Sequence, residues 1–186
     1  MRDPRRVAIL ISGRGSNMRA LVEQASSYQI ALVASNKPDA AGLEWARSQG
    51  LQTWALESKG LGKEEFDRRM SAALEDHAVG TIALAGFMRI LSPWFVEEWR
   101  GRIVNIHPSL LPKYRGLDTH TRAIEARDKV SGCTVHIVTE ELDAGEVLGQ
   151  SEVEILPGDT IASLEERVLA AEHRLYPKVM AEFVQR

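Results

Sequence analysis

The chain has 186 residues, a net charge of −3, and hydrophobic and charged fractions of 44% and 26%, as in an ordinary globular domain. This charge excludes a global basic surface that recruits nucleic acid or an anionic membrane. The single cysteine, Cys133, excludes an internal disulfide and a cysteine-rich zinc site. Only five apolar residues follow the charged N-terminus before Ser12, which predicts a strand rather than a signal peptide or membrane span. We therefore expect a cytoplasmic protein.

The first half of the chain alternates short apolar runs with amphipathic stretches. The predicted strands are residues 7–11, 30–35, 52–56, 81–85 and 103–106. Between them, Asp39 is predicted to cap a helix that runs to about Gln49, and residues 63–77 form a helix with one apolar face. Continuous hydrophobic strands in this order predict an α/β fold with a mostly parallel, Rossmann-like twisted sheet and helices on both faces.

The later part of the chain changes character. Residues 135–138 and 147–155 are strand-like and flank an acidic turn around Asp143, which predicts an antiparallel extension of the sheet. A final helix with an apolar stripe follows, and we expect Pro177 to kink or interrupt it. The chain shows no internal repeat, low-complexity tract or interdomain linker, so we predict a single domain over residues 1–186.

A glycine-rich turn, Ser12-Gly13-Arg14-Gly15-Ser16-Asn17, follows the first predicted strand. Glycines let backbone N–H groups approach an anion, and the N-terminus of the following helix adds partial positive charge. Met18 replaces the third glycine of a dinucleotide fingerprint, and no Gly-Lys-Ser/Thr follows, which disfavours an NAD site or a P-loop. The turn predicts a site for the phosphate of a small substrate, with a purely structural turn as the alternative.

Asn105 and His107 lie at the carboxyl end of the fifth predicted strand, where doubly wound sheets bind their ligands. Alternation along a strand places both side chains on one face. Transfer of a one-carbon acyl group to an amine passes through a tetrahedral intermediate with a negative oxygen, to which an amide and an imidazolium can donate hydrogen bonds. Histidine also suits proton transfer near neutral pH. The pair predicts acyl or formyl transfer, although structural hydrogen bonds are the commoner role of a lone Asn or His.

Asp143 lies much further along the chain, in the turn Glu141-Leu142-Asp143-Ala144-Gly145. An ionised carboxylate beside His107 favours the imidazolium form and raises the pKa of that side chain. Nothing in the spacing shows that the two side chains meet. On spacing alone, a surface position in the turn is the favoured interpretation of Asp143.

Four motifs, in chain order, closely resemble those of the phosphoribosylglycinamide formyltransferase family. They are residues 12–17, Ala85-Gly86-Phe87-Met88-Arg89-Ile90-Leu91-Ser92, Asn105-Ile106-His107-Pro108-Ser109-Leu110-Leu111-Pro112-Lys113-Tyr114 and Glu141-Leu142-Asp143. The likeness extends over almost the whole chain, from Val7 to about Pro177. It implies transfer of the formyl group of 10-formyltetrahydrofolate to the amine of glycinamide ribonucleotide in purine biosynthesis. It further implies direct attack by the amine, with no metal and no covalent enzyme intermediate.

The resemblance also implies roles for individual residues and regions. Asn105 and His107 would stabilise the tetrahedral intermediate, and Asp143 would raise the pKa of His107. The residues implied to bind the ribonucleotide are Gly15, Ser16, Asn17 and Glu172. Those implied to bind folate are Lys63, Met88, Arg89, Ile90, Leu91, Asn105, Thr139, Glu140, Glu141, Leu142 and Asp143. The phosphate-binding half would be about residues 1–100, and the folate-binding and catalytic half about residues 101–186.

The sequence departs from the family pattern near these positions. Arg115 and Asp118 stand where many relatives have proline and histidine, and Lys63 stands where some have arginine. The histidines His77, His120, His136 and His173 are interpreted as structural or peripheral. As partners we expect two small-molecule substrates, no nucleic acid and no membrane, with the chain as a monomer or homodimer.

Several other functions fit part of the same pattern. Methionyl-tRNA formyltransferase, sugar-nucleotide formyltransferases and formyltetrahydrofolate deformylase share the Asn–His–Asp arrangement. We expect the tRNA enzyme to carry a further basic domain and the deformylase an N-terminal regulatory domain, and we expect neither here. A non-catalytic module that binds a phosphorylated metabolite through residues 15–17 is the alternative from another class. Such a module does not require Asn105, His107 and Asp143 to lie close together.

Overall fold

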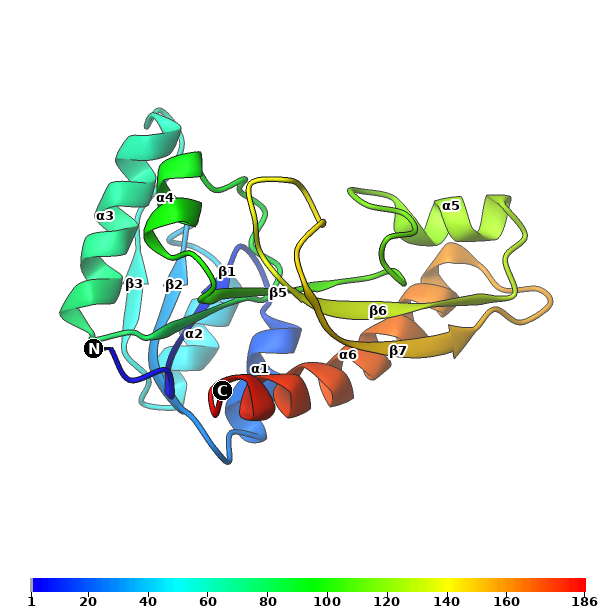
Figure 1. The fold of residues 1–186 in the computed structure, drawn as a ribbon, viewed down its shortest axis with the longest axis horizontal. Helices are drawn as coiled ribbons and strands as arrows, with labels where there is room; N and C mark the ends of the chain where they lie inside the picture. The colour runs from blue at the N-terminus through cyan, green and yellow to red at the C-terminus, as the bar shows by residue number, and fades with distance from the viewer. Residues whose placement is uncertain (1) are drawn as a thin grey trace.

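The structure is a computed structural model that describes residues 2–186, and this part of the chain forms one sheet flanked by helices (Figure 1). The strands are β1 (Arg6–Ile11), β2 (Gln29–Ser35), β3 (Thr53–Ala55), β4 (Thr81–Leu84), β5 (Ile103–His107), β6 (Val130–Ile137) and β7 (Val147–Glu154). They lie in the order β3-β2-β1-β4-β5-β6-β7. Pairing is parallel from β3 to β5, and β6 and β7 join antiparallel. The predicted mostly parallel α/β sheet with an antiparallel extension is confirmed.

Helices cover both faces of this sheet. They are α1 (Ser16–Glu23), α2 (Ala41–Ser48), α3 (Lys63–Asp76), α4 (Pro93–Glu98), α5 (Thr119–Glu125) and α6 (Ile161–Phe183). Because side chains alternate along β1, Val7, Ile9 and Ile11 pack into the core with α1, α2 and α6. Ala8 and Leu10 pack into a second core cluster with α3 and α4. Figure 1 shows these two helix layers on opposite sides of the sheet.

The short helices α4 and α5 were not predicted from the sequence. They have six and seven residues, too few to show a periodic apolar stripe. The start of α4 nevertheless carries local signals, since the Ser92 hydroxyl accepts a hydrogen bond from the Phe95 N–H and Pro93 occupies the first turn. No helix among residues 2–186 is both long and apolar enough to cross a membrane.

The predicted cap of α2 is wrong. The N-cap residue is Ala40 rather than Asp39, and it makes no side-chain capping bond. A backbone contact replaces the cap, because the N–H of Gly42 donates to the Gly13 carbonyl at 3.0 Å. This contact joins the start of α2 to the glycine-rich turn after β1.

We predicted that Pro177 would kink or interrupt α6. The interruption is wrong, because the helix continues through Pro177 from Ile161 to Phe183, and the kink stays a prediction. A proline has no N–H, so the carbonyl four residues earlier, that of His173, loses its helical partner. The Gln24 side-chain amide donates to this carbonyl at 3.0 Å. The Gln24 side chain, at the end of α1, thus supplies the hydrogen-bond donor that the His173 carbonyl lacks because of Pro177.

Tyr176 ties α6 to the centre of the sheet. Its buried hydroxyl lies 3.0 Å from the Leu84 carbonyl on β4 and 3.0 Å from the Val104 carbonyl on β5. Tyr176→Phe removes this donor and leaves both buried carbonyls without it, which we expect to cost about 1–3 kcal/mol of unfolding free energy. Denaturant titration measures the loss.

Tyr28→Phe is the matched control for this prediction. The Tyr28 hydroxyl is also buried but donates to a single carbonyl, that of Leu21, at 2.9 Å. We therefore expect a smaller loss of unfolding free energy than for Tyr176→Phe. Equal stability of Tyr176→Phe and the unmodified protein would contradict the bridging role.

Candidate functional site

The candidate site begins on β5, which extends one residue beyond the predicted strand and includes both Asn105 and His107. β5 pairs antiparallel with β6, so that Asn105 lies opposite His136 and His107 lies opposite Thr134. Residues two apart on one strand, and residues directly opposite on its neighbour, share a face of the sheet. The pairing therefore gathers the two predicted side chains and a further histidine on one face.

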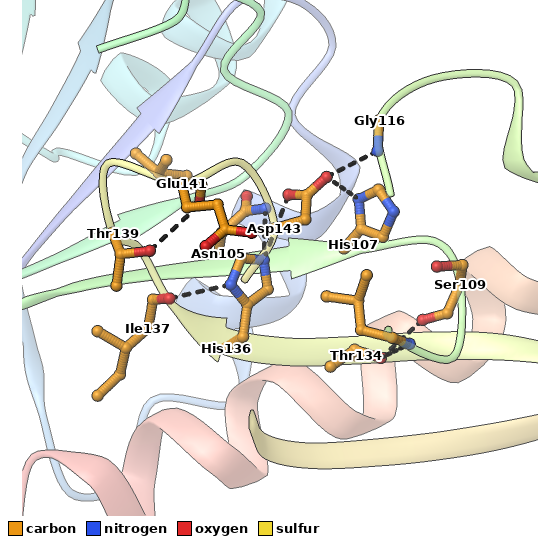
Figure 2. Close-up of polar contacts among 12 residues, drawn as sticks. Asn105, His107, Ser109, Gly116, Thr134, His136, Ile137, Thr139, Glu141 and Asp143 are labelled. Atoms are coloured by element: carbon orange, nitrogen blue, oxygen red, sulfur yellow. Dashed lines mark hydrogen bonds and ion pairs between the residues drawn. The ribbon is translucent and has the colours of Figure 1, made fainter. Parts of the chain in front are cut away.

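Asp143 reaches this face from the loop between β6 and β7 (Figure 2). One carboxylate oxygen lies 3.5 Å from His107 Nδ1, and the other lies 3.6 Å from His136 Nε2. The first oxygen also accepts a hydrogen bond from the Gly116 N–H at 2.9 Å. Both His107 and the Asp143 side chain are buried. The structure thus brings together Asn105, His107 and Asp143.

The two ring nitrogens of His107 have different partners. Nε2 lies 2.9 Å from the Tyr114 carbonyl oxygen, which can only accept a hydrogen bond, so Nε2 carries a proton. Nδ1 faces the Asp143 carboxylate at the longer distance of 3.5 Å. Nδ1 is therefore the ring nitrogen that the bond to Tyr114 leaves available.

His136 was interpreted as structural or peripheral, but it lies within this cluster. Its Nδ1 lies 3.0 Å from the Ile137 carbonyl, and its Nε2 lies 3.2 Å from the Asn105 amide nitrogen. Burial lowers the pKa of His136, against the opposing effects of the Ile137 carbonyl and the Asp143 carboxylate. A neutral ring with its proton on Nδ1 fits both contacts, and its Nε2 then takes one of the two Asn105 N–H bonds. The other N–H is free to point at a ligand.

The glycine-rich turn lies at the carboxyl end of β1, where the strand order of the sheet reverses. Gly15 has a left-handed φ of 72° and forms the N-cap of α1, followed by Ser16 and Asn17. The turn lines an open cavity of about 630 Å³ together with the cations Arg14, Arg19 and Lys37. Backbone N–H groups at a helix N-terminus beside cations form a site suited to a phosphate. Lys37 was not identified from the sequence, because it follows a different strand.

Glu172 projects from α6 to the same turn. Its carboxylate accepts a hydrogen bond from the Asn17 amide at 2.7 Å, so two predicted substrate residues from opposite ends of the chain meet. Burial raises the pKa of Glu172 to about 7, and the Asn17 bond opposes this shift. The Asn17 side-chain oxygen is buried without a hydrogen-bond partner among residues 2–186. Such an oxygen can accept a hydrogen bond from a ligand hydroxyl or amine.

The raised pKa of Glu172 predicts a loss of stability with rising pH. Between the unfolded value of 4.5 and about 7, the folded protein holds a proton that the unfolded chain has released. The stabilisation from this proton is full below pH 4.5 and is lost as the pH rises through 7. We expect Glu172→Gln, which is neutral at every pH, to exceed the unmodified protein in unfolding free energy at pH 8 by up to about 3 kcal/mol.

Denaturant titration at pH 5 and pH 8 checks this expectation, with Glu166→Gln as the control. Glu166 is an exposed carboxylate on the same helix, so its replacement should change the pH dependence little. If the unfolding free energy of Glu172→Gln falls between pH 5 and pH 8 by as much as that of the unmodified protein, Glu172 is not the cause of the pH dependence of stability.

The predicted folate residues after β4 differ in exposure. Met88 is 76% exposed and Ile90 71%, whereas Leu91 is buried in the core cluster beside α3 and α4. The Arg89 guanidinium lies 4.8 Å from the Phe66 ring centre, and its Nε is buried without a hydrogen-bond partner among residues 2–186. Exposed apolar side chains on either side of an arginine are suited to an aromatic ligand that carries an anionic group.

The remaining folate candidates lie at the start of α3 and in the loop after β6. Lys63 is the first residue of α3 and is exposed, next to Gly62, whose carbonyl is 3.5 Å from the Arg89 guanidinium. In the loop, Thr139, Glu140, Glu141 and Leu142 are exposed and precede the buried side chain of Asp143. The Thr139 hydroxyl donates to the Glu141 carbonyl at 3.1 Å, which closes a tight turn (Figure 2).

Comparison with known proteins adds to this geometry. The family model described as formyl transferase matches residues 5–180. The phosphoribosylglycinamide formyltransferase of Escherichia coli is 44% identical over 182 residues, which cover 95% of this chain and 86% of that protein. The human trifunctional purine biosynthetic protein adenosine-3 is 46% identical over 180 residues, which cover 94% of this chain but 18% of the human protein. The chain thus spans less than a fifth of that trifunctional relative.

Solved structures resemble the whole fold. The crystal structure of phosphoribosylglycinamide formyltransferase from Brucella melitensis superposes with a TM-score of 0.92 at 46% identity, covering 100% of this chain and 97% of that one. The phosphoribosylglycinamide formyltransferase structure from Anaplasma phagocytophilum gives a TM-score of 0.91, also at 46% identity, with 97% of this chain covered and 87% of that one.

Proposed function

Because the chain belongs to the formyl transferase family, we propose that it transfers the formyl group of 10-formyltetrahydrofolate to the amine of glycinamide ribonucleotide, a step of purine biosynthesis. The observation that carries the proposal is the convergence of Asn105, His107 and Asp143 from two distant segments onto one face of β5. A module that only binds a phosphorylated metabolite does not require this convergence.

In the proposed reaction, the substrate amine attacks the formyl carbon directly. A new carbon–nitrogen bond forms, and the bond from that carbon to the folate nitrogen then breaks. The amine loses a proton, the folate nitrogen gains one, and the products are the formylated ribonucleotide and tetrahydrofolate. The formyl carbon is already activated in the folate, so the proposal needs neither a metal nor a covalent enzyme intermediate.

Asn105 and His107 act on the oxygen and the protons of this reaction. The Asn105 N–H that His136 does not take donates a hydrogen bond to the oxygen that becomes negative in the tetrahedral intermediate. His107 serves as the general acid through Nδ1, while its Nε2 stays bonded to the Tyr114 carbonyl. Asp143 favours the protonated form of His107 before the transfer.

The remaining residues hold the two substrates. The cavity at the glycine-rich turn takes the phosphate through the backbone of Gly15, Ser16 and Asn17, with Arg14 and Lys37 nearby. Glu172 and the unpaired Asn17 oxygen are suited to hydroxyl groups of the ribose. The exposed apolar residues 88, 90 and 142 suit the pterin ring system, and the cations Lys63 and Arg89 suit the folate carboxylates.

An assay with two acceptors tests the proposal. The protein is incubated with 10-formyltetrahydrofolate, with glycinamide ribonucleotide either present or omitted, and both formyl products are quantified. We expect formylated ribonucleotide and little formate. Formate in both incubations would identify a deformylase instead, and no turnover combined with tight phosphate binding would favour a binding module.

A further inference from the structure

The segment of residues 114–117 touches both members of the His107–Asp143 pair. The Tyr114 carbonyl accepts from His107 Nε2 at 2.9 Å. The Gly116 N–H donates to the Asp143 oxygen that faces His107, also at 2.9 Å (Figure 2). Two backbone groups of a four-residue segment therefore orient the acid and its carboxylate partner. A displacement of this segment changes both side chains at once.

The backbone of this segment is unfavourable by itself. Tyr114 has a φ of 58° and Gly116 a φ of 80°, and the following Asp118 has a φ of 57°. A left-handed φ is disfavoured for a bulky side chain such as tyrosine, so contacts outside the segment must hold it in place. The ion pair of Arg115 with Glu141 is a weak restraint, because its two side chains are 42% and 74% exposed.

Arg122 is an exposed residue of α5 that makes several of the contacts that hold the segment. One guanidinium nitrogen donates to the Arg115 carbonyl at 2.7 Å and lies 3.2 Å from the Leu117 carbonyl. The same guanidinium lies 4.9 Å from the centre of the Tyr114 ring. A planar guanidinium can stack on a ring while it donates hydrogen bonds at its edge, which a lysine ammonium cannot reproduce. Two further contacts fix Tyr114 itself: its hydroxyl donates to Asp128 at 2.7 Å, and the Ser109 hydroxyl lies 3.3 Å from its carbonyl.

We propose that Arg122 is a positioning residue for formyl transfer, which holds the 114–117 segment where it orients His107 and Asp143. The inference rests on the proposed function for its kinetic consequence, but the contact itself can be tested without substrate. Arg122 touches neither His107 nor Asp143 and acts through the backbone of Tyr114 and Gly116.

The test combines kinetics with NMR of the histidine ring. In Arg122→Ala, kcat should fall by about 10- to 100-fold because His107 is misplaced, while KM for the ribonucleotide changes by less than about twofold. Arg122→Lys should recover little of this loss, because it lacks the planar fork. The Nε2 signal of His107 in ¹⁵N-labelled protein should move in both variants, since its bond to the Tyr114 carbonyl is disturbed.

Lys129→Ala is the control, because it removes an exposed cation shortly after the same helix. It should leave both the rate and the His107 signal unchanged. An unmoved His107 signal in Arg122→Ala, or an unchanged kcat in a protein that transfers formyl groups, overturns the positioning role. If the unmodified protein transfers no formyl group to the ribonucleotide, the proposed function fails, and the NMR comparison still decides whether Arg122 orients His107.

Discussion

His107→Ala should lower the kcat of formyl transfer by about 100- to 10,000-fold, the usual range when a positioned general acid is removed. The substitution removes the ring that faces Asp143 and bonds the Tyr114 carbonyl. Phosphate binding at the glycine-rich turn should persist, because that turn lies after a different strand. Steady-state kinetics and isothermal titration with the ribonucleotide measure the two effects separately.

Two further variants separate chemistry from folding. His107→Gln keeps an amide donor for the Tyr114 carbonyl but cannot transfer a proton, so we expect the same large loss of rate. His77→Ala removes a histidine at the end of α3, outside the cluster, and should retain normal turnover. Near-normal activity of His107→Ala would rule out a catalytic role for this side chain.

Asn105→Ala should lower kcat by about 100- to 1000-fold, as measured for removal of one donor to a developing oxyanion. The variant also leaves His136 Nε2 without its amide partner. Asn105→Asp should be at least as slow, because a carboxylate places negative charge and no donor where the oxyanion forms. Single-turnover rates at saturating folate and ribonucleotide measure these losses at the chemical step.

Thermal unfolding controls for a structural effect of the Asn105 variants. Asn105→Asp conserves size, so its fold should be retained while its rate falls. If Asn105→Ala keeps more than about a tenth of the normal single-turnover rate, the amide is not the principal donor to the oxygen.

Strand periodicity predicted the parts of the structure that depend on local patterns. The continuous apolar strands predicted the parallel sheet, and alternation along β5 placed Asn105 and His107 on one face. The predictions for the start of α2 and for Pro177 in α6 were wrong because, in each helix, a residue distant in the sequence makes the hydrogen bond that the local sequence lacks. Gly13 replaces a side-chain cap on α2, and Gln24 satisfies the carbonyl that Pro177 leaves free.

In the site, too, local sequence patterns predict some features, whereas others depend on residues that are distant in the sequence. Asp143 meets His107 because the loop after β6 folds back over β5, which no spacing in the sequence reveals. His136 was missed because its position opposite Asn105 depends on the antiparallel register of β5 and β6. Leu91, another predicted folate residue, has its side chain packed in the core beside α3 and α4, and its contact with folate stays a prediction.

A rapid-quench experiment with ¹³C-labelled formyl groups tests the central claim most directly. The protein is mixed with 10-formyltetrahydrofolate labelled at the formyl carbon, and glycinamide ribonucleotide is added in a single turnover. We predict that the label passes to the ribonucleotide amine, at a rate set by His107 and Asn105, and never appears on the protein. Label bound covalently to the protein before the ribonucleotide is added, or released as formate in its presence, would contradict direct formyl transfer at this site.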